Sequence, residues 1–78
     1  MSSQRVHIRV GEDLGRAVAE LRRRRGLTQE EAGDLTGLSK SYVSKIESGR
    51  STSLLDHELR ILRRLGARVT VEFDDGAT

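Results

Sequence analysis

The sequence predicts an all-α domain of four helices, with a short C-terminal strand and a candidate strand at the N-terminus. Residues 12–25 and 53–65 repeat apolar residues at spacings of three and four, the period of an amphipathic helix. Between them, capping residues and glycines mark two shorter helices. Both ends of the chain alternate with a period of two instead. With 78 residues, the chain can form one small domain.

The N-terminal segment, residues 1–11, is a predicted strand or arm. Its first four residues are polar, and we expect them to fray. The alternation that follows is typical of a short, half-buried strand. The apolar side consists of Val6, Ile8 and Val10, and the other side of Arg5, His7 and Arg9.

The predicted helical domain covers residues 12–66. In its first helix, Glu12 and Asp13 lie at the positive end, and a run of arginines, residues 22–25, lies at the negative end, as the helix dipole favours. The apolar stripe of this helix consists of Leu14, Ala17, Val18 and Leu21.

Two short helices with a tight turn between them occupy residues 28–48. Thr28 can cap the first helix, and Glu31, three residues later, completes a capping box. Gly37 suits the left-handed turn that ends this helix. Ser39 can cap the second helix, which Gly49 ends.

The last predicted helix runs from a cap at Ser53, three residues before Asp56, to about residue 65. Gly66 ends it. We expect a buried apolar stripe with further apolar residues on its flanks. The stripe consists of Leu55, Leu59 and Leu62, and the flanks of Leu54, Ile61 and Leu65.

Residues 67–78 form a predicted dimerisation strand and tail. Alternation in residues 68–73 places Val69, Val71 and Phe73 on one face. A lone strand cannot satisfy its backbone groups, so this strand needs a partner. The partner is either the N-terminal strand of the same chain or the same strand of a second chain. Residues 74–78 are acidic and small, and we expect them to be loose.

Composition narrows the function classes. The chain has 14 Lys and Arg against 12 Asp and Glu, so the distribution of charge matters more than the net charge of +2. It contains no cysteine and no long apolar run, which predicts neither disulfides nor a membrane span. We expect a cytoplasmic protein.

The second short helix has a polar face suited to double-stranded DNA, opposite Val43 and Ile46. Small hydroxyls can approach base edges in the major groove, and lysine can donate to O6 and N7 of guanine. The predicted base contacts are Lys40, Ser41, Ser44 and Lys45. The predicted phosphate contacts are Tyr42, Ser48, Arg50 and, at the positive end of the preceding helix, Gln29.

Two other basic segments leave alternatives open. Residues 5–10 could be a basic arm that reaches for DNA instead of a strand. The arginines at positions 23–25 could contact nucleic acid or could form a solvated helix end.

The segment from Leu27 to Arg50 resembles the helix-turn-helix of the XRE family, the lambda-Cro-like repressors. Ala32 and Gly33 replace the leucine and alanine that are usual there, and Gly33 should cost the helix about 1 kcal/mol against alanine. Lys40 stands where glutamine is common, which we interpret as an altered base preference. The matches are Leu27, Thr28, Gln29, Glu30, Glu31, Gly37, Leu38, Ser39, Val43, Ile46, Glu47, Gly49 and Arg50.

The resemblance implies a lambda-repressor-like fold and a homodimer that represses transcription at a palindromic operator. It also implies an ion pair between Arg22 and Glu47 as a structural tie. The ending LRILRRLGARVTVEF is similar to the HipB-like antitoxin branch, which implies autorepression and binding of a HipA-like kinase toxin. The alternatives are a stand-alone regulator without a toxin and a protein–protein adaptor that retains the fold.

The sequence predicts no enzyme. His7 and His57 fall in separate elements and have no cysteine to help them, so we expect no metal site and no cofactor. The segment from Gly37 to Ser41 resembles a phosphate loop, but Ser39 stands where such a loop needs glycine.

Overall fold

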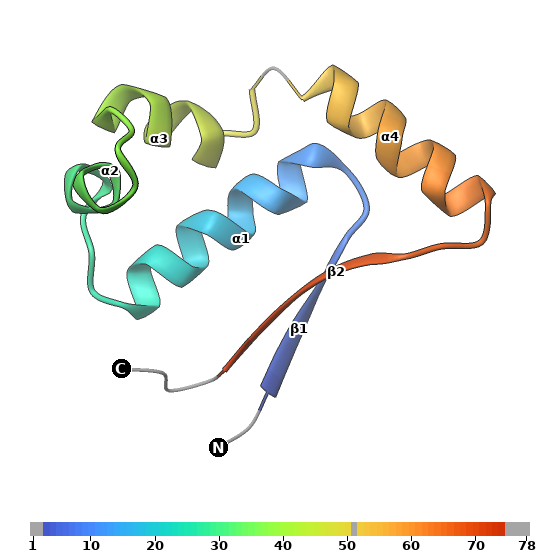
Figure 1. Cartoon of the computed structure of the whole chain (residues 1–78), viewed down its shortest axis with the longest axis horizontal. Helices are drawn as coiled ribbons and strands as arrows, with labels where there is room; N and C mark the ends of the chain where they lie inside the picture. Colours follow the sequence, from blue (N-terminus) through green and yellow to red (C-terminus); the bar gives the residue numbers. More distant parts are fainter. Residues whose placement is uncertain (1–2, 51, 75–78) are drawn as a thin grey trace.

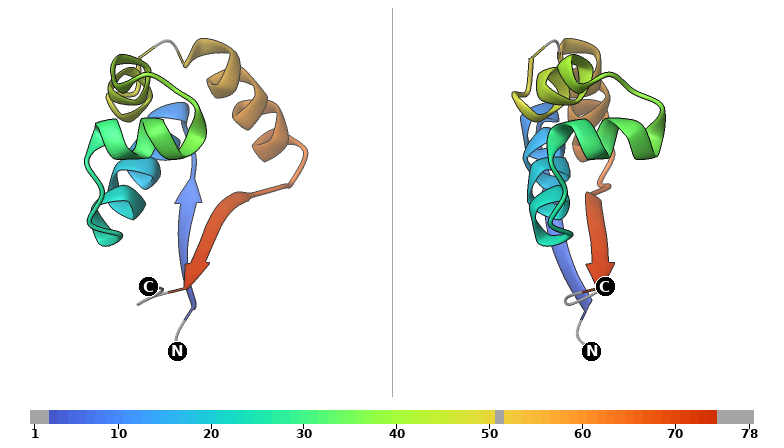
Figure 2. Two further views of the ribbon diagram at one scale, coloured as in Figure 1. Left: turned by 60° about the vertical axis from the view of Figure 1, so that its left-hand side comes forward. Right: turned by 90° about the vertical axis from the view of Figure 1, so that its left-hand side faces the viewer.

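The computed structural model describes residues 3–50 and 52–74 and confirms four helices with short terminal strands. The elements are β1 (Ser3–Ile8), α1 (Gly11–Arg24), α2 (Gln29–Thr36), α3 (Lys40–Glu47), α4 (Ser53–Arg64) and β2 (Val69–Asp74) (Figure 1). Figures 1 and 2 show α4 at the opposite edge of the molecule from α2. The loose ends expected at residues 1–2 and 75–78 lie outside the described residues.

The two strands pair with each other, antiparallel, within the one chain. Val6 lies opposite Val71, and Ile8 lies opposite Val69. The strand begins earlier than predicted, because Ser3 and Gln4 join the ladder instead of fraying, and it ends before Val10, which is exposed. The segment is therefore a strand of the sheet, and the alternative of a free basic arm is wrong.

The sheet supplies part of the core. Ile8, Ala17 and Leu59 form a buried cluster where β1, α1 and α4 meet. Val69 and Val71 pack against this cluster, because alternate residues of a strand point to the same face. These side chains therefore stabilise the fold of their own chain, and their part in dimerisation stays a prediction.

Two features of the apolar stripes differ from expectation. Val18 on α1 and Leu62 on α4 were expected to be buried, but both are exposed. Of the predicted stripe on α1, Ala17 is buried against Ile8 and Leu59, and Ala19, outside that stripe, is buried as well. The arginine run also contributes locally, since the Arg24 guanidinium carbon lies 5.2 Å from the centre of the Phe73 ring.

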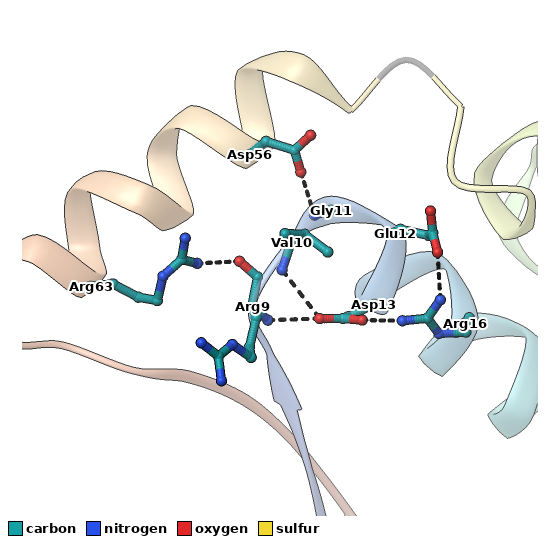
Figure 3. A network of polar contacts seen from close by, with 8 residues as sticks. All are labelled: Arg9, Val10, Gly11, Glu12, Asp13, Arg16, Asp56 and Arg63. Atoms are coloured by element: carbon teal, nitrogen blue, oxygen red, sulfur yellow. Dashed lines mark hydrogen bonds and ion pairs between the residues drawn. The ribbon is translucent and has the colours of Figure 1, made fainter.

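Asp13 organises the turn between β1 and α1 (Figure 3). Its Oδ2 accepts hydrogen bonds from the backbone amides of Arg9, at 2.9 Å, and Val10, at 3.2 Å. Its other oxygen pairs with Arg16. The Arg9 amide, as the largest cause, holds the pKa of Asp13 below its ordinary value. The carboxylate thus satisfies backbone donors that the start of α1 would leave without a partner.

Asp56 and Arg63 connect α4 to the same turn. Asp56 Oδ1 accepts a hydrogen bond from the Gly11 amide at 2.6 Å, and Arg63 donates to the Arg9 carbonyl (Figure 3). The predicted cap is wrong by one residue, because α4 begins at Ser53 and Thr52 is the residue before it. The Thr52 hydroxyl donates to Asp56 Oδ2 at 3.0 Å and so positions this carboxylate.

Glycine allows two close approaches beneath α3. A Cβ added at Gly15 on α1 would collide with the carbonyl oxygen of Ile46, and one added at Gly33 on α2 would collide with that of Leu38. The low helix propensity of Gly33 is therefore only one of two contributions of this residue to the free energy of folding. At this position the absence of a side chain lets α2 pack against the turn.

We predict that Gly33→Ala destabilises the protein by about 1–3 kcal/mol, because the added methyl must displace the backbone of the turn. Helix propensity alone would give the opposite sign, a gain of about 1 kcal/mol. Urea unfolding of the variant and of an Asp34→Ala control, which changes an exposed neighbour on the same helix, measures the difference. A Gly33→Ala protein more stable than wild type would contradict the close approach.

Candidate nucleic-acid interface

The turn between α2 and α3 is built as the sequence predicts. Thr28 and Glu31 form the capping box, with the Glu31 amide donating to the Thr28 hydroxyl at 3.0 Å and the Thr28 amide donating to the Glu31 carboxylate at 2.8 Å. Gly37 adopts a left-handed conformation with φ of 77°. The Ser39 hydroxyl then accepts a hydrogen bond from the Tyr42 amide at 3.1 Å, which starts α3. These capping residues fix where α2 begins and ends and where α3 begins.

One face of α3 is buried and the other is open to solvent. Val43 belongs to the core, and Ile46 is half-buried. All four predicted base-contacting side chains, Lys40, Ser41, Ser44 and Lys45, are exposed. A protein surface of this kind leaves the amines and hydroxyls free to meet base edges.

A shallow groove runs along this exposed face. It brings together three of the predicted base-contacting residues and two of the predicted phosphate-contacting residues, and none of its lining residues is acidic. The lining residues are Ser41, Ser44, Lys45, Ser48 and Arg50. Lys40 is the first residue of α3 and directly precedes Ser41, but it does not line the groove.

Two of the predicted phosphate contacts already have partners inside the protein. The Gln29 side-chain amide donates to Glu47 Oε1 at 3.0 Å, and the Ser48 hydroxyl donates to the Lys45 carbonyl at 2.7 Å. A hydroxyl has one hydrogen, so Ser48 must rotate to donate to a phosphate, whereas Gln29 keeps a second amide hydrogen. Arg50 is exposed and is free of a described ion pair.

Tyr42 lies at the border of a second hollow. This cavity, of about 320 Å³, opens between α1, α3 and the start of α4. Lys45 and Arg50 also line it, so the cationic surface continues from the groove to this hollow. The tyrosine ring is about half exposed, which leaves its hydroxyl accessible to a polyanion on this side.

An ion pair between Arg22 and Glu47 holds α3 on α1. Arg22 Nε donates to Glu47 Oε2 at 2.7 Å and Nη2 donates to Oε1 at 3.0 Å, a two-point contact that fixes orientation as well as distance. The two side chains are only 14% and 7% exposed. The expectation drawn from the family resemblance is thus met in the geometry.

Two further groups, which no sequence pattern indicated, hydrogen-bond to this ion pair. Arg22 Nη1 also donates to the Leu27 carbonyl at 2.8 Å, and Gln29 completes the shell around the carboxylate. The hydrogen bond from Arg22 is the largest cause that lowers the pKa of Glu47, and the same bond raises the pKa of Arg22. One charged cluster therefore joins α1, the entry to α2 and the end of α3.

We predict that Glu47→Gln lowers the free energy of unfolding at pH 7 by about 1–3 kcal/mol, because the charged acceptor of a shielded hydrogen-bonded pair is lost. Glu20→Gln is the matched control, since Glu20 pairs with Arg24 on the exposed surface of α1, where such pairs contribute at most about 0.5 kcal/mol. Equal losses from the two variants in urea unfolding would refute a special role for Glu47.

The same pair predicts a pH dependence. The folded pKa of Glu47 lies below its ordinary value of 4.5, so its stabilisation is present above that value and is lost as the pH falls through the folded pKa. The stability difference between wild type and Glu47→Gln should therefore narrow as the pH falls below 4.5. A difference that stays constant down to the acid transition would show that the charge contributes nothing.

Other kinds of site find little support in residues 3–50 and 52–74. Within these residues no three His, Asp or Glu side chains gather as metal ligands. None of the helices described is long and apolar enough to cross a membrane.

Comparison with known proteins gives two partial relatives and no matching solved structure. A competence pilus inhibition repressor of Acinetobacter baylyi is 49% identical over 37 residues, which is 47% of this chain and 34% of that protein. An uncharacterized HTH-type transcriptional regulator, y4dJ, of Sinorhizobium fredii is 49% identical over 37 residues, 47% of this chain and 48% of that protein. The match thus spans half or less of either relative.

A family profile covers more of the chain. The helix-turn-helix family HTH_3 matches residues 18–69, which include the second half of α1, all of α2 to α4 and the first residue of β2. The match contains the capped turn, the Arg22–Glu47 pair and the exposed face of α3. The chain therefore belongs to the helix-turn-helix family.

Proposed function

We propose that this protein binds double-stranded DNA sequence-specifically through α3 and represses transcription at a palindromic operator. The observation that carries the proposal is the exposed, acid-free face of α3, which is oriented by caps at one end and by the Arg22–Glu47 pair at the other. Family membership supports the same function, as do two relatives named as a repressor and a transcriptional regulator.

The exposed face supplies the two kinds of contact that recognition needs. Lys40 and Lys45 can donate to guanine, and the short side chains of Ser41 and Ser44 let the helix come close to the base edges. Arg50, Tyr42, Gln29 and Ser48 would hold phosphates on either side and so fix the position of α3 in the groove.

A single α3 reads few base pairs, so we propose that the protein acts as a homodimer. Two copies related by a two-fold axis would place their α3 helices in successive major grooves about 34 Å apart. This arrangement explains why the proposed operator is palindromic.

We propose further that the protein is a HipB-like antitoxin, which represses its own operon and neutralises a HipA-like kinase. The support is the succession of α4, the left-handed Gly66 with φ of 89°, and β2, which matches the resemblance of the C-terminal sequence. A stand-alone regulator would share the DNA surface and lack the kinase partner, and an adaptor would lack both.

Replacing either Lys40 or Lys45 with alanine should weaken binding by about 1–3 kcal/mol if each makes a good base contact. The ligand is a duplex selected from a random pool with the wild-type protein, and the measurement is a fluorescence anisotropy titration at several salt concentrations. The wild-type binding constant should fall as the salt concentration rises. A plot of its logarithm against the logarithm of the salt concentration should have a downward slope of about 0.9 for each phosphate contacted.

Arg5→Ala is the control for this titration. It also removes one cation, from the sheet on the far side of the molecule from α3 (Figure 1). If the Lys40→Ala/Lys45→Ala double variant binds the duplex as tightly as wild type does, the assignment of DNA contacts to α3 is wrong. Failure of the wild-type protein to enrich any duplex would favour the adaptor.

The antitoxin proposal predicts a stable complex with a HipA-like kinase encoded beside it. Co-expression with such a kinase should give co-purification and should relieve growth arrest caused by the kinase. The Lys40→Ala/Lys45→Ala variant should still bind the kinase if the two surfaces are separate. Absence of co-purification and of rescue would leave the stand-alone regulator.

A further inference from the structure

The hollow between α1, α3 and the start of α4 has an apolar floor. Each of the three helices supplies one half-buried aliphatic side chain to it: Leu14 from α1, Ile46 from α3 and Leu55 from α4. Its volume of about 320 Å³ lies at the lower end of the range of about 300–1,000 Å³ that is typical of small-molecule pockets. We call this hollow the α1–α3 cavity.

Close contacts and hydrogen bonds fix the walls of this cavity. A Cβ added at Gly15 would collide with the carbonyl oxygen of Ile46, and one added at Gly11 would collide with the side chain of Thr52. Asp56 accepts hydrogen bonds from the Gly11 amide at 2.6 Å and from the Thr52 hydroxyl at 3.0 Å. The cavity is therefore formed before any ligand arrives, which lowers the entropic cost of binding.

The opening of the α1–α3 cavity is cationic. Lys45 and Arg50 line it and are exposed, and neither takes part in an ion pair within the described residues. None of the lining residues is acidic. Glu12 lies close to Gly49, but its carboxylate pairs with Arg16 at 2.6 Å. The ammonium and guanidinium groups are therefore available to an anion from solvent.

We propose that the α1–α3 cavity binds a small molecule with an apolar body and one carboxylate, and that this ligand and DNA exclude each other. The apolar body would cover the aliphatic floor, and the carboxylate would accept hydrogen bonds from Arg50 and Lys45. An uncharged molecule would leave the two cations without a partner, and a bare anion would leave the floor in contact with water.

The exclusion of DNA follows from side chains that the two ligands would share. Lys45 and Arg50 line both the cavity and the groove on the exposed face of α3, and Tyr42 borders the cavity. All three are proposed DNA contacts. A carboxylate held by the two cations would occupy their donors and neutralise part of the charge that attracts phosphates. By linkage, DNA should weaken binding of the carboxylate by the same factor.

Only the exclusion of DNA rests on the proposed function, because the cavity itself needs no DNA. If the protein is a repressor, a small apolar carboxylate would release it from its operator. Repression would then respond to the concentration of such a compound in the cell.

Tyrosine fluorescence of the whole chain tests the cavity without DNA. Tyr42 is the only tyrosine in the sequence, which contains no tryptophan, so the signal comes from the wall of this cavity. The probe is octanoate, and octanol and acetate are its controls. Octanoate should change the fluorescence saturably and bind about tenfold or more tighter than octanol, because hydrogen bonds to charged groups contribute about 1.5–3 kcal/mol. Acetate should give no saturable change over the same range.

Arg50→Met removes one cation from the opening and keeps an apolar stem. Because Arg50 is exposed, the variant should keep its fold, as far-ultraviolet circular dichroism would show. It should bind octanoate about tenfold more weakly and octanol as before. Arg60→Met is the matched control, since Arg60 is exposed on α4 and does not line the cavity, and it should bind octanoate like wild type.

Three results would overturn the cavity ligand. They are a fluorescence that octanoate does not change saturably, equal affinities for octanoate and octanol, and unchanged octanoate binding by folded Arg50→Met.

Fluorescence anisotropy of a selected duplex tests the exclusion of DNA. Octanoate should release the labelled duplex from the wild-type protein, whereas acetate at the same concentration, which matches the ionic strength, should leave it bound. A duplex that stays bound at saturating octanoate would overturn the exclusion. A wild-type protein that binds octanoate saturably and enriches no duplex would refute the proposed function and leave the cavity ligand standing.

Discussion

The structure depends on one shielded ion pair between Arg22 and Glu47. Arg22 lies in the last turn of α1 and Glu47 ends α3, and the same guanidinium reaches the carbonyl of Leu27 just before α2. Three helices are therefore positioned by one group of charged hydrogen bonds. Apolar packing alone would hold them weakly, because the small residues beneath α3 bury little area. Removing either charge would leave the other partly buried without an opposite charge, so the pair disfavours any arrangement of the helices that separates the two groups.

The exposed face of α3 follows from that constraint. The turn at Gly37 and the cap at Ser39 set where α3 starts, and Glu47 sets where it is anchored. Because the two ends are held, the polar residues between them must face outward. The close approaches at Gly15 and Gly33 complete this arrangement, since a larger residue would move α3 away from its support.

Most of the local structure could be predicted because its causes are local. The capping box at Thr28 and Glu31 needs only residues three apart, and the left-handed turn at Gly37 needs only a glycine. What could not be predicted depends on contacts between distant segments. The sequence allowed β2 to pair within or between chains, Thr52 rather than Ser53 precedes α4, and Gln29 reaches Glu47 instead of lying free. Leu62 was expected inside, but the open packing of α4 leaves it exposed.

We propose that DNA binds at α3, which this ion pair holds in position. Backbone amide shifts in nuclear magnetic resonance spectra, recorded while a selected duplex is added to the labelled protein, test it most directly. We predict that the largest shift changes fall on residues 40–50, with small changes along β1 and β2. Largest changes along the two strands, with those of α3 unmoved, would contradict it.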